Sequence, residues 1–185
     1  EQVHIALGYP AVSLFDPALY PLVVLATVLG GNMSSRLFTE VREKRGLAYY
    51  IRASLETFED TGALAIYAGL DKSKINLALT TILNELRLIV SQEVNPEELN
   101  RAKEYLKGKL ILRLEDSAEI IHWLATQQLM KGKIAKLPEH FKKIDRVTAK
   151  EVQTAAGKII KTARANLAII GPFKDKNKFL NIFNN

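Results

Sequence analysis

Cysteine is absent from the 185 residues of this chain. Its absence excludes disulfide scaffolds, cysteine nucleophiles and thiolate zinc sites. No apolar run approaches the ~18 residues that a membrane-spanning helix needs, so we expect no membrane span and no membrane partner. Histidine is scarce too, and His4, His122 and His140 lack the i, i+4 spacing of a helical zinc site.

The composition is otherwise that of an ordinary globular domain, with 48% hydrophobic and 25% charged residues. A chain of this length can bury a core without a covalent staple. We predict one domain over residues 1–171 and a polar C-terminal tail over 172–185. The chain begins at Glu1 rather than Met and enters an apolar strand at once, so we expect a fragment of a longer protein. The compartment is open, with the cytoplasm as the working expectation.

Alternation of apolar residues predicts the strands. Val3, Ile5 and Leu7 alternate with smaller or polar residues and predict a strand over 3–8. The turn at residues 60–62 joins predicted strands over 48–58 and 63–69 into an antiparallel hairpin. A last strand is predicted over 166–170.

Cap signals and helical spacing predict the helices. Asp16-Pro17 indicates the start of a helix that ends at Gly30-Gly31, and a second helix follows from Ser34 or Ser35 to about Gly46. Further helices are indicated near residues 75, 95, 116, 138 and 148. The predicted order is β-α-α-β-β-α-α-α-α-β. It favours an α+β fold of two layers, with a mostly antiparallel or mixed sheet and helices packed on one face.

Two short patterns suggest chemistry only weakly. The glycines and serines of residues 30–35 precede a helix, but they lack the Lys-Ser/Thr of a phosphate-binding P-loop, so a helix end and a helix start is the simpler interpretation. Glu119 and His122 are three residues apart and could hold half a metal site, although a hydrogen-bonded pair is more typical of this spacing. Spacing alone therefore predicts no catalytic machinery.

The positive charge is concentrated in the second half of the chain. Residues 101–185 contain 18 of the 26 Lys/Arg, and the whole chain has a net charge of +6. A basic half can indicate nucleic-acid binding. The lysines are dispersed along the sequence, however, and solvated helix faces explain them more simply, so we do not expect a nucleic-acid partner.

Several segments in combination are much more specific. The first runs from Leu29-Gly30-Gly31 to Phe38, and the second from Val41-Arg42 to Tyr49. The others are Phe58–Gly62, Ala63–Gly69, Leu99–Glu115, Gln127–Gly132 and Val147–Ala149.

Together these segments resemble the C-terminal, non-zinc half of the pitrilysin/insulinase-type zinc metallopeptidases, in the branch that includes mitochondrial processing peptidase. The resemblance covers about Val3 to Gly171. It implies two similar α+β halves that enclose a chamber for peptides. The N-terminal half carries the zinc motif His-x-x-Glu-His and a distant Glu ligand. This chain contains no His-x-x-Glu-His, so the resemblance implies no metal and no cofactor in this fragment, with zinc in the N-terminal half of the parent.

The resemblance also implies two substrate-binding residues, an Arg and a Tyr seven positions apart, which match Arg42 and Tyr49 here. Negative charge develops on the carbonyl oxygen during peptide hydrolysis. A fixed Tyr hydroxyl can donate to that oxygen, and a guanidinium can hold substrate carbonyls or a carboxylate. The zinc, its water and the general base would come from the other half.

The residues alone leave alternatives open for this pair. Arg42 lies at a charged helix end, where a solvated cation is common. Strand alternation places Tyr49 on the same face as Ile51 and Ala53, and therefore favours Tyr50 as the exposed tyrosine.

The hypothesis is a non-catalytic partner domain of a zinc metalloendopeptidase that forms half of a peptide-binding chamber. The alternative is a domain of an inactive homologue that acts as a structural or protein-binding subunit. The expected partners are an N-terminal zinc-binding half or a separate catalytic subunit, and a peptide substrate. A second copy of the chain is a further candidate.

Overall fold

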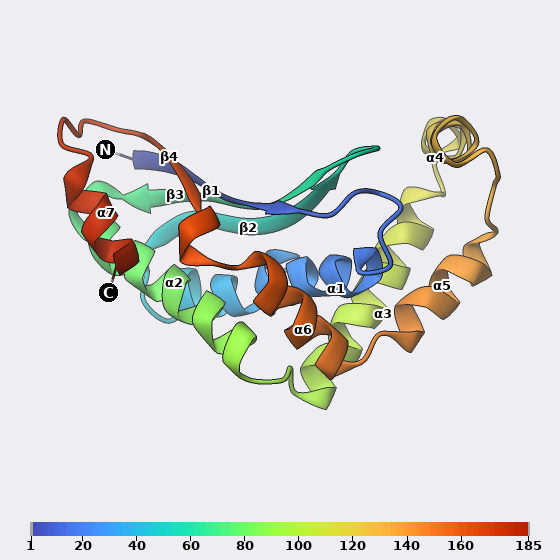
Figure 1. Ribbon diagram of the computed structural model, residues 1–185, viewed down its shortest axis with the longest axis horizontal. Coiled ribbons are helices and arrows are strands. Elements are labelled where there is room, and N and C mark those ends of the chain that lie inside the picture. The colour runs from blue at the N-terminus through green and yellow to red at the C-terminus, as the bar shows by residue number, and fades with distance from the viewer. Residues whose placement is uncertain (1, 185) are drawn as a thin grey trace.

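The computed structural model describes residues 2–184, and side chains over 2–183. One antiparallel sheet has the strand order β2-β3-β1-β4. Figure 1 shows helices α1, α2 and α6 on one side of this sheet, with the opposite face uncovered. The strands are β1 (Gln2–Ala11), β2 (Ala48–Thr57), β3 (Gly62–Asp71) and β4 (Asn166–Ile170). The helices are α1 (Leu19–Gly30), α2 (Ile75–Ser91), α3 (Pro96–Arg113), α4 (Ser117–Lys131), α5 (Leu137–Arg146), α6 (Ala149–Ile159) and α7 (Asn177–Asn184).

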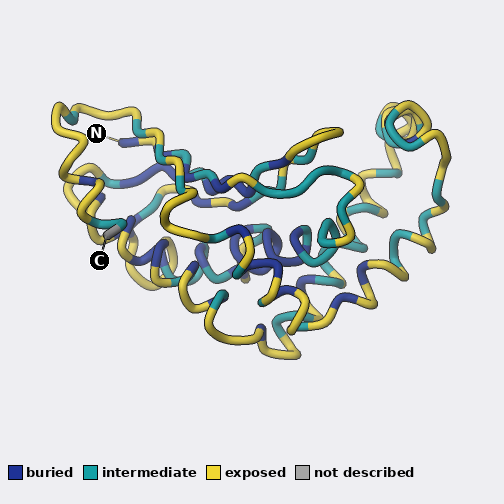
Figure 2. Tube along the Cα trace, viewed as in Figure 1, coloured by how far each residue is buried: buried dark blue, intermediate teal, exposed yellow. Residues whose placement is uncertain are grey.

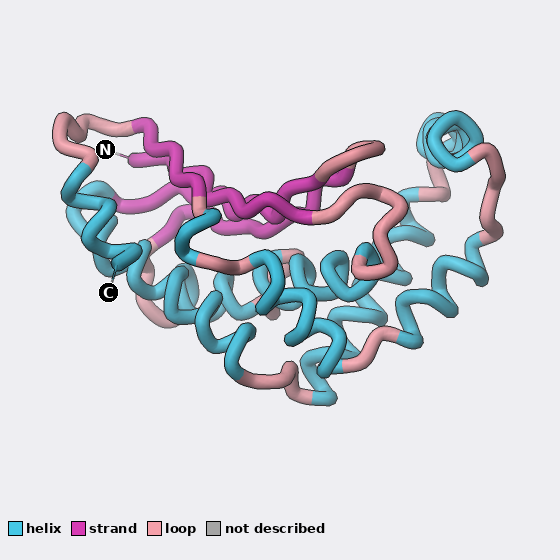
Figure 3. The backbone as a smooth tube through the Cα atoms, viewed as in Figure 1, coloured by secondary structure: helices cyan, strands magenta, loops and turns pink. Residues whose placement is uncertain are grey.

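The predicted α+β class and its single helical layer are confirmed, as the separation of helices and strands in Figure 3 also shows. The predicted order was wrong in one respect. Five helices lie between β3 and β4, whereas the predicted order has four. The predicted order therefore omitted one of the five helix starts that the sequence indicates.

The start of the first helix also differs from its prediction. Helix α1 begins at Leu19, and the Asp16 carboxylate accepts from the Ala18 N–H at 2.7 Å in the preceding turn. Asp favours such local turns as strongly as helix caps. The predicted helix starts near residues 95 and 148 are confirmed: Asn95 caps α3, and Thr148 forms a capping box with Glu151 at α6. Asp116 caps α4, but Glu119 pairs with Arg113 and completes no capping box there.

The core lies between the sheet and the helices. Val3, Ile5 and Leu7 of β1 are buried, and so are Leu64 and Ile66 of β3 on the same face. Figure 2 shows this buried layer running between strands and helices. Helix α1 is buried at Leu22 and at residues 24–30, which is nearly its whole circumference. A helix that is apolar all round is stable only when neighbours enclose it, and α1 contacts β2, α3 and α6.

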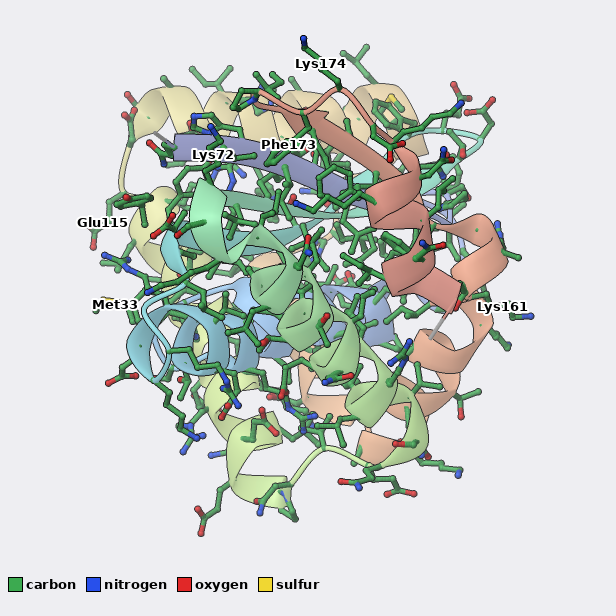
Figure 4. All side chains as sticks on the ribbon, turned by 90° about the vertical axis from the view of Figure 1, so that its left-hand side faces the viewer. Met33, Lys72, Glu115, Lys161, Phe173 and Lys174 are labelled. Atoms are coloured by element: carbon green, nitrogen blue, oxygen red, sulfur yellow. The ribbon has the colours of Figure 1, made fainter. Side chains whose placement is uncertain are left out.

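Residues 172–184 contain helix α7 in the structure. The α7 residue Phe179 is buried, and its ring lies edge-on to Phe173 with centroids 5.1 Å apart. Lys174, which follows Phe173 in the sequence, points away from the body of the domain in Figure 4. The division of the chain at residue 171 stays a prediction.

Helix α4 lies at one end of the molecule (Figure 1) and is joined to the body by a polar network. Its buried Gln127 Oε1 accepts from the Ala135 N–H at 3.0 Å, which fixes the orientation of the amide. His140 Nε2 lies 3.2 Å from the same oxygen and must therefore donate. His140 Nδ1 then accepts from the Tyr20 hydroxyl at 2.9 Å, so one neutral imidazole links α4, α5 and α1.

We predict that acid weakens this link. Burial, followed by Lys131 and Lys143, lowers the pKa of His140 below its usual value. A histidine whose pKa is lowered by folding stabilises the fold above its unfolded pKa of about 6.5, and that contribution is lost as pH falls. Urea unfolding between pH 7.5 and 5.5 should show a drop in stability that is smaller in His140→Gln. His122→Gln, on the exposed face of α4, is the matched control. A drop of equal size in both variants would contradict the assignment.

We also predict that Gly30→Ala destabilises the domain. A Cβ at residue 30 would lie 2.3 Å from the Ala53 backbone nitrogen. Overpacking of this kind costs roughly 1–3 kcal/mol of unfolding free energy. Gly108→Ala in α3 is the control, because a Cβ there meets nothing within 4 Å and should stabilise by about 0.5–1 kcal/mol. Denaturant titration of the two variants measures both effects, and equal stabilities would refute the close contact.

Candidate functional site

The segment after α1 is held tightly by its own polar groups. Asn32 Oδ1 accepts from the Ser34 N–H at 2.8 Å, and the Ser35 hydroxyl donates to the Asn32 carbonyl at 2.5 Å. The cavity beside these residues measures only about 20 Å³, too small for a phosphate group. Met33, at the edge of the molecule in Figure 4, is largely exposed. The structure therefore agrees with a helix end followed by a helix start.

Arg36 attaches this segment to helix α3. Its guanidinium donates to both carboxylate oxygens of Glu98, each at 2.8 Å. Both side chains are only 18% exposed. A bidentate pair of this geometry fixes position as well as charge, so Arg36 is a structural residue.

Arg42 lies in a π-helical turn, Phe38–Glu43. The Lys44 N–H donates to the Thr39 carbonyl at 2.9 Å, five residues back, which widens the turn. Such wide turns occur frequently at functional sites. Val41 points into the core, and Arg42 is exposed on the outer side.

The neighbouring cations are paired, whereas Arg42 is not. Glu40 accepts from Lys44 and from Arg45, each at 2.5 Å, and these bonds lower the pKa of Glu40. Within residues 2–184, Arg42 has no carboxylate partner, and its guanidinium lies 4.8 Å from the centre of the Phe38 ring. Arg42 is therefore the guanidinium of this segment that remains available to a ligand.

A tight turn carries the chain from Arg42 into strand β2. Gly46 has φ +57°, a conformation that glycine adopts without strain, and the Leu47 N–H donates to the Val41 carbonyl at 2.9 Å. The strand then opens with an irregularity. Ala48 pairs with Leu70 and Tyr50 with Gly69, so Tyr49 is the extra residue of a β-bulge.

The bulge overturns the expectation from alternation. Tyr49 is 59% exposed and Tyr50 is 38% exposed, although the pattern of Ile51 and Ala53 assigned Tyr49 to the core face. An extra residue breaks the period of two, and bulges often redirect side chains beside functional sites. The structure thus leaves Arg42 exposed in the turn before edge strand β2 and Tyr49 exposed at the start of that strand.

The uncovered face of the sheet next to Tyr49 carries polar and aromatic side chains. His4 Nδ1 and the Tyr50 hydroxyl share a hydrogen bond of 3.0 Å. The Arg52 guanidinium lies 5.0 Å from the centre of the Tyr67 ring. Sequence alternation favoured an exposed Tyr50, but its partner His4 and the contact of Arg52 with Tyr67 depend on the order of the strands.

The suggested half metal site is used otherwise. Glu119 forms an ion pair with Arg113, and His122 is exposed. In the part of the chain that the structure describes, no group of three His, Asp or Glu side chains lies close enough to hold a metal ion. Over the same residues, none of the helices combines the length and the apolar character needed to cross a bilayer.

The structure brings together cations that are dispersed in the sequence. Lys131 and Lys133 at the end of α4, and Lys143 and Arg146 of α5, line one pocket of about 490 Å³. Their spacing over sixteen positions gave no sign of this convergence. The only local signal is the i, i+3 pair on α5.

Comparison with known proteins places the chain in a family. Residues 1–106 match the model described as the Peptidase M16 inactive domain. An uncharacterized zinc protease of Streptomyces coelicolor is 36% identical over 95% of this chain and 38% of its own length. An uncharacterized zinc protease of Bacillus subtilis is 34% identical over 93% and 42%. A solved M16 inactive domain from Pseudomonas fluorescens, 21% identical, has the same fold, with a TM-score of 0.83 over 94% of this chain and 42% of that one.

The fold and the family model thus define an inactive domain of a metallopeptidase. The chain belongs to the M16 peptidase family, which confirms the predicted pitrilysin/insulinase-type relationship. It spans about two fifths of the length of the curated relatives that it matches. The processing-peptidase branch stays a prediction.

We predict that this 185-residue chain alone binds no stoichiometric zinc. Three protein ligands are usual even at an open catalytic zinc site, and the described residues bring no such group together. Metal analysis after equilibration with equimolar zinc and gel filtration should find much less than one zinc per chain. One tightly held equivalent, lost in His122→Ala, would instead assign a site to the Glu119–His122 face.

Proposed function

We propose that this domain is the non-catalytic partner of a zinc-bearing half in a metalloendopeptidase. In this proposal it forms one wall of a peptide-binding chamber and contributes Arg42 and Tyr49 to substrate binding. The zinc, its water and the general base belong to the N-terminal half of the parent or to a separate catalytic subunit. The peptide is the substrate of the assembly, not of this chain alone.

The availability of Arg42 is the observation that carries the proposal. Arg36 and Arg45 are both engaged with carboxylates, whereas Arg42 has only the Phe38 ring beside it. A guanidinium presents five donors in a rigid planar fork that suits peptide carbonyls and carboxylates. Contact with Phe38 limits the freedom of the arginine while leaving its N–H groups to a ligand.

Tyr49 supports the proposal through its exposure. A bulged residue at the start of an edge strand can present its hydroxyl to a ligand without breaking a ladder hydrogen bond. A donor of this kind stabilises the oxyanion that forms as water attacks the peptide carbonyl. The names of the relatives, which are called zinc proteases, support the presence of zinc in the parent protein.

The test uses the full-length parent with a fluorogenic peptide library. Arg42→Ala should raise KM and lower kcat/KM, because ground-state contacts to the peptide are lost. Tyr49→Phe removes only a hydroxyl and should lower kcat by roughly 10²-fold, as expected for loss of one oxyanion donor.

Matched controls separate these roles from general damage. Lys44→Gln removes an exposed cation of the same turn, and Tyr50→Phe removes the adjacent hydroxyl. Both should retain kcat/KM within a few-fold. If Arg42→Ala and Tyr49→Phe are as active as these controls, the catalytic contribution fails. The alternative, a structural or protein-binding subunit of an inactive homologue, would then be preferred.

A further inference from the structure

A second concave site lies on the helical side of the domain, away from Arg42. It is bounded by the loop that leads into α1, the end of α4, helix α5 and the start of α6. Its volume of about 490 Å³ falls within the range of small-molecule sites, roughly 300–1,000 Å³.

Four cations line this pocket, and none of them has an ion-pair partner within residues 2–184. They are Lys131, Lys133, Lys143 and Arg146. Two cations of the neighbouring helix α3 are paired, Lys107 with Asp145 and Arg113 with Glu119. Over the described residues, the four cations of the pocket are not neutralised by ion pairs and so remain available to a ligand.

Two carboxylates also line the pocket, and one oxygen of each is engaged with the backbone. Asp16 accepts from the Ala18 N–H at 2.7 Å, and Glu151 accepts from the Thr148 N–H at 2.8 Å. With four positive and two negative groups, the pocket keeps an excess of positive charge. An anionic ligand would offset that excess.

The cations are close enough to repel one another. Burial lowers the pKa of Lys131, and Lys143 and Lys133 lower it further. Repulsion between like charges is relieved when an anion binds between them. Lys143 Nζ also lies 5.5 Å from the centre of the Tyr20 ring, which holds this ammonium at the pocket wall.

Apolar side chains also line the pocket. Phe15 is 52% exposed, and Leu14, Pro17 and Val147 lie beside the same cavity. An exposed aromatic ring next to unpaired cations suits a ligand with a flat apolar part and an anionic part. A guanidinium such as that of Arg146 recognises phosphate with two parallel donors.

We infer that this pocket binds a small organic phosphate, with its phosphates on Lys143, Arg146 and Lys131 and its ring on Phe15. The site is independent of Arg42 and Tyr49 and of the proposed peptidase function. Inorganic phosphates share the anionic chemistry but not the contact with Phe15, so the two sources can be separated.

Isothermal titration of the 185-residue chain with ADP and with pyrophosphate, in 50 mM NaCl, tests the inference. Both probes should bind saturably. Lys143→Gln/Arg146→Gln should weaken both by at least tenfold, and Lys131→Gln should do so to a lesser degree. Phe15→Ala should weaken ADP several-fold and leave pyrophosphate unchanged.

Lys150→Gln/Lys158→Gln is the matched control, because it removes the same charge from the neighbouring helix α6 outside the pocket. It should bind both probes like the unsubstituted chain. Circular dichroism and urea unfolding should show that all variants remain folded. Equal weakening in the control would reduce the effect to net charge and overturn the site.

Three further outcomes would overturn the inference. The first is the absence of saturable binding by either probe. The second is equal binding of ADP and pyrophosphate that Phe15→Ala does not change, since it would assign the pocket to inorganic phosphate. The third is binding of a DNA oligonucleotide more tightly than ADP with the same variant sensitivity, since it would make the pocket part of a nucleic-acid surface.

Discussion

The enclosure of helix α1 on almost every side is the constraint on which the rest of the structure depends. Gly30 makes this enclosure tight, because the Ala53 backbone lies where a Cβ would stand. Both candidate sites extend from the ends of this helix. The chain that leaves the C-terminal end of α1 forms the turn of Arg42 after residues 31–37. The N-terminal end of α1 carries Tyr20, which lies beside the cationic pocket. A close-packed interior has low compressibility, so α1 gives both sites a rigid base.

The distribution of ion pairs distinguishes structural charges from available ones. Arg36 with Glu98 closes a half-buried contact between two segments far apart in the chain, and Glu40 holds two cations of its own turn. The more exposed pairs of Glu40 contribute little stability individually. Their consequence here is selective, since Glu40 pairs with Lys44 and Arg45, and no ion pair of the described residues engages Arg42.

Much of the fold follows from local pattern, and its failures have identifiable causes. Alternation predicts all four strands and the hairpin, because one face of the sheet is buried. The same alternation fails at Tyr49, where a bulge adds a residue that no local pattern indicates. The pairing of His4 with Tyr50 depends on strand order, and the convergence of Lys131 with Lys143 depends on how α4 turns into α5. Both features depend on tertiary structure, which local sequence patterns do not encode. Family resemblance could therefore indicate Arg42 and Tyr49, but nothing in the sequence predicted the cationic pocket.

The uncovered sheet face meets a requirement that a peptide-binding wall must satisfy. Such a wall has to be stable in water before any peptide arrives, and an antiparallel sheet can leave one face solvated when that face is polar. Tyr50 is satisfied by His4, and Tyr67 donates to Glu56 at 2.9 Å while its ring lies beneath Arg52. These side chains restrain one another and so have little conformational entropy left to lose on binding. Within residues 2–184, the Arg42 guanidinium has no carboxylate partner and the Tyr49 side chain is exposed at the edge strand, so under the proposed function these two residues would supply the free donors.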